Sequence, residues 1–229
     1  MNLLRYLPLA GLLLMTVACA EEEPAADYQP GVHYQLINQG SAPATPRENI
    51  EVVEVFSYMC GHCNTFQPHI RNWHNNFPDQ VQFNRMPVSW RNWEPFARAY
   101  YTAEAMGILD ATHQPMFDAL HKQHTRFRSM DDIADFYTAF DVTKEQFLST
   151  AQSFAVDMKL RQSNKLSQDF GVTGTPTLVI NGKYRISASQ AVNQAQMIEV
   201  ANYLIAREAE SLVVPEAAED AVAAADSGE

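Results

Sequence analysis

The sequence predicts an α/β protein of 229 residues, with a β-α-β unit, a block of helices and a β-β-α unit in that order. Three observations predict this class. An apolar run of strand length, residues 50–57, is followed at once by a helical stripe of apolar residues. A long stretch with helical patterns comes next. Near the end, two β-rich runs flank the turn dipeptide Asn181-Gly182, which predicts a hairpin.

The first unit opens with a strand over residues 50–57, whose near-continuous β-branched and aromatic residues are typical of a strand covered on both faces. After it, apolar residues recur at steps of three and four, which indicates one buried face of a helix. These residues are Cys63, Phe66, Ile70, Trp73 and Phe77. Cys60 then lies at the N-terminus of that helix, and Pro68 is expected to kink it.

The remaining elements follow from the same periodicities. A short strand is expected over residues 81–86. The expected helices of the block span residues 96–107, 115–124, 131–140 and 144–168, the last with a break. Thr143 and Gln146 form a capping-box pattern before that last helix. The hairpin pairs residues 177–180 with 183–186, and a helix over residues 189–207 closes the core.

The net charge of −11 is concentrated in two flanking segments. Of the 27 acidic residues, 11 lie before residue 28 or after residue 207, which leaves 16 acids against 15 Lys and Arg between them. This near-neutral core argues against a nucleic-acid binder, and no apolar run reaches the roughly 18–20 residues of a membrane-spanning helix. Residues 208–229 are rich in Ala, Glu and Asp and lack aromatics, so we expect an acidic disordered tail there.

The first 20 residues have the features of an export signal, a positive residue followed by an apolar stretch. Two processing alternatives overlap at its end. Residues 18–20 fit small-x-small cleavage, which would release a soluble protein. Residues 16–19 resemble a bacterial lipobox, in which Cys19 would carry a lipid anchor and provide the only attachment to a membrane. Residues 21–30 are an acidic linker in either case, and the folded part is expected outside the cytoplasm.

Two cysteines, Cys60 and Cys63, remain after the signal and form a C-x-x-C motif. A loop this short constrains the unfolded chain very little, so the pair is poorly placed as a structural staple. A redox dithiol, half of a metal site and an inert loop are the alternatives. No second C-x-x-C follows, and His69 lies too close for zinc-finger spacing, so the spacing favours a redox dithiol.

The position of the motif on the helix makes the two sulfurs unequal. Free backbone N–H groups and the positive end of the helix dipole would stabilise a thiolate at Cys60. Cys63, on the buried stripe, would be shielded. An imidazolium at His62, between the two, would stabilise the thiolate further. This asymmetry distinguishes an attacking sulfur from a resolving one.

Glu54 interrupts the buried strand with a charge. It alternates with Ile50, Val52 and Phe56, so its carboxylate should point into the same packed layer and its pKa should rise. A bulge that turns it to solvent is the alternative. Arg85, on the neighbouring strand, is a candidate charge partner, and an ordinary surface arginine is the alternative for it.

This order of elements, with C-x-x-C on the first helix and Thr175-Pro176 just before the hairpin, resembles the thioredoxin fold. The helical block is similar to the all-helical insertion of the DsbA family. Specific matches are Glu-Val-Phe-Ser-Tyr-Met before Cys60, His62 inside the motif, and the stretch 171–177 with Asn-Gly-Lys-Tyr behind it. The resemblance covers about residues 30–207. It implies a thioredoxin-like domain over residues 31–88 and 165–207, with the insertion over residues 89–164.

The resemblance implies a periplasmic thiol:disulfide oxidoreductase that donates the Cys60–Cys63 disulfide to reduced, unfolded exported proteins. A DsbB-like membrane oxidase would reoxidise it, and no cofactor beyond the disulfide is implied. The resemblance also assigns site roles to His62, Thr175 and Pro176, with a cis bond between the last two. It assigns Glu54 to moving protons at the resolving cysteine.

Two positions depart from the family pattern. Gly61 stands where the DsbA motif usually has proline, and Thr175 stands where well-studied oxidases have valine. Both resemble the isomerase and reductase branches, so a reductase or isomerase is the alternative within the same chemistry. The segment before Glu51 is too short for the dimerisation domain of the DsbC type. A chaperone-like binding protein with this fold and a lipid anchor is the alternative from another class.

Overall fold

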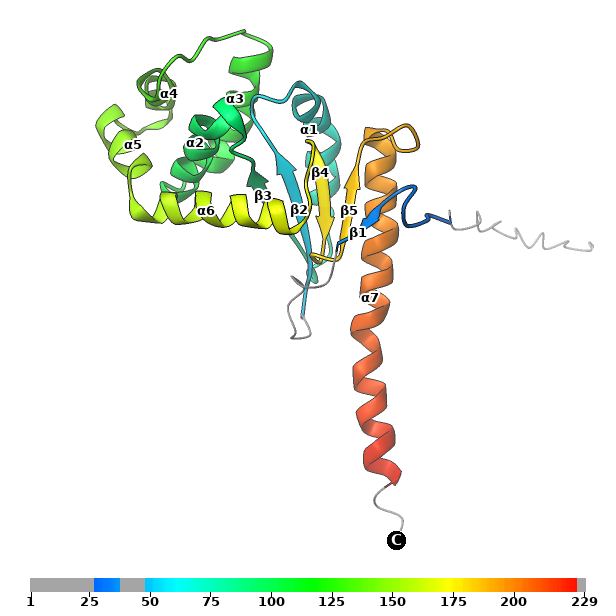
Figure 1. Ribbon diagram of the computed structural model, residues 1–229. Helices are drawn as coiled ribbons and strands as arrows, with labels where there is room; N and C mark the ends of the chain where they lie inside the picture. Colours follow the sequence, from blue (N-terminus) through cyan, green and yellow to red (C-terminus); the bar gives the residue numbers. More distant parts are fainter. Residues whose placement is uncertain (1–26, 38–47, 226–229) are drawn as a thin grey trace, which may run out of the picture.

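A computed structural model of the chain describes residues 27–37 and 48–225 (Figure 1). The expected export signal, Cys19 and most of the linker therefore lie outside the described residues. The five strands form one mixed sheet in the order β1-β5-β4-β2-β3. They span Gln35–Leu36 (β1), Ile50–Phe56 (β2), Val81–Pro87 (β3), Thr177–Ile180 (β4) and Tyr184–Ser187 (β5).

The central strand β2 joins the two halves of the sequence. It runs parallel to β3 on one side and antiparallel to β4 on the other, so segments more than 120 residues apart are neighbours in the sheet. The register with β3 is unbroken from Ile50 to Phe56 and pairs Glu54 with Arg85. The bulge alternative for Glu54 is therefore wrong, and its predicted burial is confirmed, because the residue is 0% exposed.

Two helices, α1 (Gly61–His74) and α7 (Gln194–Ala225), cover one face of the sheet. Their core there includes Ile50, Val52, Phe66, Ile70, Leu178, Met197 and Leu204. The end of α6 (Phe154–Asp169) and the segment after β3 cover the other face, where Val53, Val55 and Val179 pack. The sheet is covered on both faces, as the apolar run over residues 50–57 predicts.

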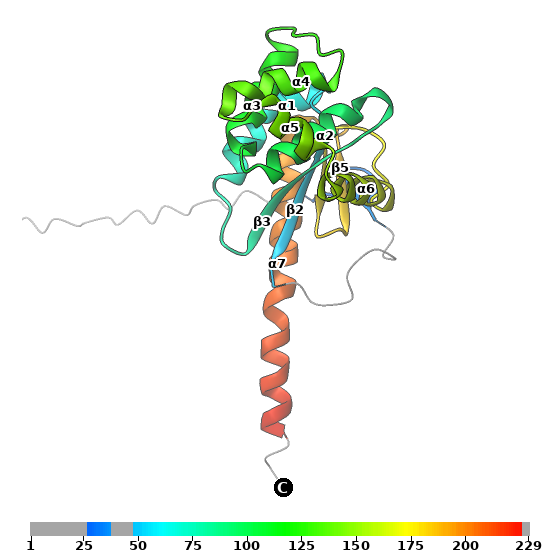
Figure 2. The same cartoon turned by 90° about the vertical axis from the view of Figure 1, so that its left-hand side faces the viewer.

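The helical block lies on the side of the sheet that β3 borders (Figures 1 and 2). It contains a short 3-10 helix at Arg91–Trp93, α2 (Glu94–Ala105), α3 (Leu109–His121), α4 (Met130–Tyr137), a second 3-10 turn at Thr138–Phe140, and α5 (Lys144–Ala151). α6 then returns from the block to the sheet. Buried aromatic residues of the block, among them Phe117, Tyr137 and Phe147, form one core with Phe56 and Tyr58 of the sheet end.

Local sequence signals account for several boundaries. The Thr143–Gln146 capping box is present in full. Asn181 and Gly182 have φ of 52° and 66°, the left-handed values that a type I′ turn requires at both central positions, so the hairpin is confirmed. The predicted break in the long helix is confirmed at Ser153, whose hydroxyl accepts from Val156 N and begins α6.

The start of α3 differs from the expectation. The expected helix starts at Pro115. The helix instead begins at Leu109, and Pro115 lies inside it. Thr112 and Met116 are buried on its inner face, and this packing holds the turn that precedes the proline.

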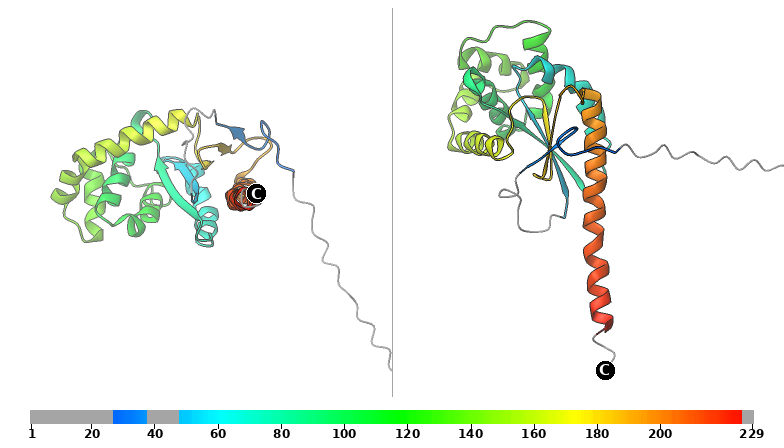
Figure 3. Two further views of the ribbon diagram at one scale, coloured as in Figure 1. Left: turned by 90° about the horizontal axis from the view of Figure 1, so that it is seen from below. Right: turned by 45° about the vertical axis from the view of Figure 1, so that its right-hand side comes forward.

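The last helix is longer than expected, and the disordered-tail prediction for residues 208–229 is wrong for residues 208–225. α7 continues past the sheet to Ala225 (Figure 3). Alanine and glutamate favour helix even where they supply little apolar surface. Glu208, which we had assigned to the tail, is only 3% exposed. Its carboxylate accepts from Asn181 Nδ2 at 2.6 Å, Lys183 Nζ at 2.7 Å and Tyr184 OH at 3.0 Å.

Glu208→Ala should lower the free energy of unfolding by about 1–3 kcal/mol, because it leaves three donors of the hairpin without their acceptor. Although burial opposes it, hydrogen bonds from Lys183, Asn181 and Tyr184 lower the pKa of Glu208 below 4.5. The stabilisation by the Glu208 carboxylate is therefore present at neutral pH and is lost as the pH falls through that lowered pKa. Urea denaturation measures both effects. Glu210→Ala, at an exposed position on the same helix, is the control, and an equal cost for both variants would contradict the prediction.

Candidate active site

Cys60 occupies the junction between β2 and α1. It is the N-cap of α1, with extended backbone (φ −89°, ψ 114°), and its Sγ accepts a hydrogen bond from Cys63 N at 3.3 Å. A hydrogen bond from Cys60 N to Ser57 O at 3.1 Å closes the preceding loop. The helix stripe buries Cys63 completely, whereas Cys60 stays partly exposed. The sulfurs thus occupy the unequal positions that the sequence predicts.

The segment before β4 completes the site from the other half of the chain. The Thr175–Pro176 peptide bond is cis, which confirms that expectation. Cys60 Sγ, as a thiol, donates to Thr175 O at 3.4 Å. Both cysteines are free thiols here, so the structure represents the reduced form.

The two thiols have opposite pKa shifts. Hydrogen bonding from the Cys63 thiol, followed by the Thr175 side chain and the backbone of Cys63 and His62, lowers the pKa of Cys60 to about 5 although burial opposes it. Burial raises the pKa of Cys63 well above its usual value, and the neighbouring Cys60 raises it further. At neutral pH the reduced site therefore holds one thiolate, at Cys60, and one thiol, at Cys63.

His62 lowers the pKa of Cys60 through its backbone, whereas we expect the effect from its imidazole. The side chain of His62 is exposed, and the hydrogen bond to Cys60 comes from the backbone. Its carbonyl accepts from Thr65 Oγ1 at 3.0 Å and from Gln194 Nε2 at 2.6 Å, which ties this turn of α1 to the start of α7. A charge effect of the imidazolium on the thiolate stays a prediction.

Alkylation should report this asymmetry. Because only the thiolate reacts, the rate of Cys60 with iodoacetamide should rise with a midpoint near pH 5, whereas Cys63 should react slowly up to at least pH 8. Peptide mass spectrometry after brief labelling separates the two sites. Labelling in urea is the control, since both thiols should then titrate alike. Faster labelling of Cys63 in the folded protein at pH 7 would reverse the assignment.

Glu54 lies in a buried hydrogen-bonded network that joins β2 to α1 and β3. Its Oε1 accepts from Gln67 Nε2 at 2.9 Å, and its Oε2 accepts from Arg85 Nε at 3.2 Å. Burial raises the pKa of Glu54, and Arg85 and Gln67 oppose this. Arg85 is thus the charge partner and not an ordinary surface arginine. Its Nη2 also lies 3.3 Å from His74 Nε2.

Gln67 is a site residue that we do not predict from the sequence, although its spacing from Cys63 is a usable signal. Gln67 lies four residues after Cys63, so both share the buried face of α1. His74, seven residues after Gln67 on the same helix, stacks on Phe83 with ring centroids 4.5 Å apart.

Two histidines of α3 hold the loop that carries Cys60. His113 Nδ1 lies 2.9 Å from Tyr58 OH, and His121 Nε2 lies 2.7 Å from the carbonyl oxygen of Tyr58. His113 is only 6% exposed and belongs to the buried part of the helical block. Burial lowers its pKa well below the usual value, so the ring is neutral. The helical block thereby anchors the residue two positions before Cys60.

Within residues 27–37 and 48–225, no group of three or more His, Cys, Asp or Glu residues is arranged to hold a metal ion. Across the same residues, no helix combines the length and the apolar character that crossing a membrane requires.

A C-x-x-C dithiol at a helix N-terminus, with one stabilised thiolate and one shielded thiol beside a cis-proline, defines a thiol:disulfide oxidoreductase of the thioredoxin fold. A sequence profile of the DSBA-like thioredoxin domain matches residues 80–204. The thiol:disulfide interchange protein DsbA of Pseudomonas aeruginosa is 35% identical over 206 residues, which cover 90% of this chain and 97% of the relative. DsbA of Azotobacter vinelandii is 34% identical over 202 residues, covering 87% and 94%.

Solved structures agree with these sequence relationships. The crystal structure of Pseudomonas aeruginosa DsbA superposes with a TM-score of 0.75 at 36% identity, covering 82% of this chain and 97% of that one. The oxidoreductase DsbA from Xylella fastidiosa gives a TM-score of 0.72 at 30% identity, covering 78% and 96%. The chain belongs to the DsbA family of thiol:disulfide interchange proteins.

Proposed function

We propose that this protein introduces disulfide bonds into exported proteins, with Cys60 as the attacked sulfur and Cys63 as the leaving one. The observation that carries the proposal is the opposite direction of the two pKa shifts. A thiolate at Cys60 stabilises the reduced protein, and whatever stabilises the reduced form makes the disulfide a stronger oxidant. The disulfide is the only redox group that this chemistry needs.

The reaction takes two exchanges. A substrate thiolate attacks Cys60 Sγ in the oxidised protein, the Cys60–Cys63 bond breaks, and Cys63 departs with the electron pair and takes up a proton. The second substrate thiolate then attacks the substrate sulfur of the mixed disulfide and releases Cys60 as a thiolate. The substrate loses two electrons and two protons. One proton is held by Cys63 and the other goes to solvent.

We assign the supporting roles from the buried network and from the causes of the pKa shifts. Glu54 moves the proton at Cys63, since it is a buried carboxyl with a raised pKa that accepts from Gln67, one helical turn after Cys63 on α1. Thr175 and the backbone of His62 stabilise the leaving thiolate at Cys60. Pro176 places the Thr175 carbonyl beside that sulfur, where the backbone of a substrate can pair. Thr175, which resembled the reductase branch in sequence, supports an oxidase through its effect on Cys60.

The export pattern of residues 1–20 supports a periplasmic location, with a DsbB-like membrane protein as the oxidant that restores the disulfide. The match of residues 16–19 to a lipobox supports a lipid anchor at Cys19 as the alternative to a free protein. The mass of the mature N-terminal peptide decides between them.

Oxidation of reduced, unfolded ribonuclease tests the function. One equivalent of the oxidised protein should remove about two ribonuclease thiols within minutes in a buffer without glutathione, and itself become reduced. The same protein with both cysteines replaced by alanine is the control. A reduced protein that instead cleaves insulin disulfides faster than its oxidised form oxidises ribonuclease would establish the reductase alternative.

A further inference from the structure

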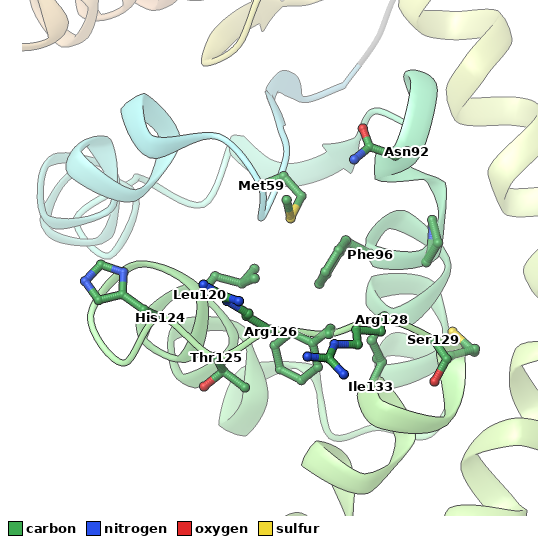
Figure 4. A pocket seen from close by; sticks show the side chains of 13 residues that line it. Met59, Asn92, Phe96, Leu120, His124, Thr125, Arg126, Arg128, Ser129 and Ile133 are labelled. Carbon is green, nitrogen blue, oxygen red and sulfur yellow. The ribbon is translucent and has the colours of Figure 1, made fainter.

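A pocket of about 630 Å³ lies between the helical block and Met59, the residue before Cys60. Met59, the residue before Cys60, forms one wall, and Phe96 of α2 points into the pocket from another (Figure 4). The connection between α3 and α4 forms the opposite wall. A chain joined to Cys60 by a mixed disulfide would therefore be attached one residue from the wall of this pocket. Its volume is within the range of ligand-binding pockets.

The floor of the pocket is apolar and rigidly packed. Phe96 and Ile133 are buried, and Phe127 packs edge-on against Phe96 with ring centroids 5.9 Å apart. The ring of Phe127 contacts Phe136 on its other side at the same centroid distance. These contacts fix the connection between α3 and α4, and leave an apolar surface open toward the active site.

The rim of the pocket is basic. Arg126 and Arg128, on either side of Phe127, line the pocket and are exposed. Neither guanidinium has an ion-pair partner among the residues that the structure describes. Of the nearest acids in sequence, Asp131 pairs with Lys144, and Asp132 accepts from the backbone N–H of Arg128 and not from its guanidinium. Two guanidinium groups without an ion-pair partner among the described residues thus line this pocket, in a protein of net charge −11.

We propose that this pocket is a specificity subsite for the substrate segment that flanks the reacting cysteine. It takes an aromatic or long aliphatic side chain on its floor, with a neighbouring carboxylate on Arg126 and Arg128. The proposal rests on the proposed function, since it concerns the same reduced exported proteins. The apolar floor and the two arginines of the pocket are complementary to such a segment, and Met59 connects the pocket directly to Cys60.

Reduced dithiol peptides that differ at one flanking position test the subsite. The peptides carry Phe-Glu, Phe-Gln or Phe-Lys beside the cysteine, and the second-order rate of their oxidation by the full-length oxidised protein is measured at pH 7. The native protein should oxidise the Glu peptide about threefold to tenfold faster than the Lys peptide, with Gln between them, and added salt should reduce the difference. Replacing Phe by Ala in the Glu peptide should slow its oxidation.

The double variant Arg126→Glu, Arg128→Glu should invert the order of the Glu and Lys peptides. Arg161→Glu reverses an exposed charge on α6 outside the pocket and should keep the native order. Dithiothreitol, which has no flanking residues, should be oxidised equally by all three proteins. If dithiothreitol is oxidised but the double variant keeps the native order, the subsite is wrong and the proposed function stands. If no protein oxidises dithiothreitol, the proposed function itself fails.

Discussion

Replacing Cys63 by alanine is expected to trap the protein in mixed disulfides with its substrates. Once Cys60 has formed a disulfide with a substrate, the shielded thiol of Cys63 is the group placed to resolve it in the reverse direction, because the two residues are one helical turn apart. Without it, a Cys60 thiolate that attacks a substrate disulfide stays joined to that substrate until another thiol releases it. Catalytic turnover should fall to the uncatalysed background, because the variant cannot form the Cys60–Cys63 disulfide. Non-reducing gels and peptide mass spectrometry would identify the adducts.

Cys60→Ala is the matched control. It leaves only the buried thiol, whose pKa is raised, so adducts should be nearly absent while turnover is equally lost. Adducts that form through Cys63 in this variant, at rates like those of Cys60 in the other, would contradict the assignment of the two roles.

The reduced protein is expected to resist urea better than the oxidised protein near pH 7. The lowered pKa of Cys60, about 5 against 9.0 for an unperturbed thiol, means that folding of the reduced chain favours the thiolate. Because solvent reaches Cys60 and weakens the effect, we expect the thiolate to add about 1–2 kcal/mol to the free energy of unfolding of the reduced protein at pH 7. The disulfide form has no such thiolate. A stabilised reduced form is the known reason why DsbA itself is a strong oxidant.

The pH dependence of this difference follows from the sign of the shift. Because its pKa is lowered, the Cys60 thiolate stabilises the folded reduced protein. This stabilisation is complete above the unfolded pKa of 9.0 and is lost progressively as the pH falls to the folded pKa near 5. The gap between the urea midpoints of the two forms should therefore widen from pH 5 to pH 8. A gap that is constant over this range would show that the thiolate is not its source.

Short-range signals in the sequence predicted much of this site. The C-x-x-C between a buried strand and an apolar helical stripe was sufficient to predict unequal sulfurs. The period of two along β2 predicted the burial of Glu54, and the turn residues Asn181 and Gly182 predicted the hairpin. In each case the structure is determined by residues that are neighbours in the sequence, so the local pattern is enough to predict it.

Contacts between distant segments were not predictable in the same way. His113 and His121 contact Tyr58 only because α3 packs beside the active-site loop. The sequence around a histidine on a helix does not indicate which distant residue it will contact. The effect of the Thr175 side chain on Cys60 depends on segments 115 residues apart. The burial of Glu208 was not predicted, because the composition of residues 208–229 as a whole is typical of a disordered tail. Its three hydrogen-bond donors come from the hairpin, which is distant in sequence.

The reduction potential of the Cys60–Cys63 pair tests the central claim most directly. Equilibration with glutathione at pH 7, read by alkylation and mass spectrometry, should give a value clearly above the roughly −270 mV of thioredoxin. Between pH 5 and 8 the potential should fall by about 30 mV per pH unit, because reduction takes up one proton for two electrons while Cys60 stays ionised. A potential at or below that of thioredoxin, or a slope of about 59 mV per pH unit through pH 7, would contradict a stabilised Cys60 thiolate and the oxidase that depends on it.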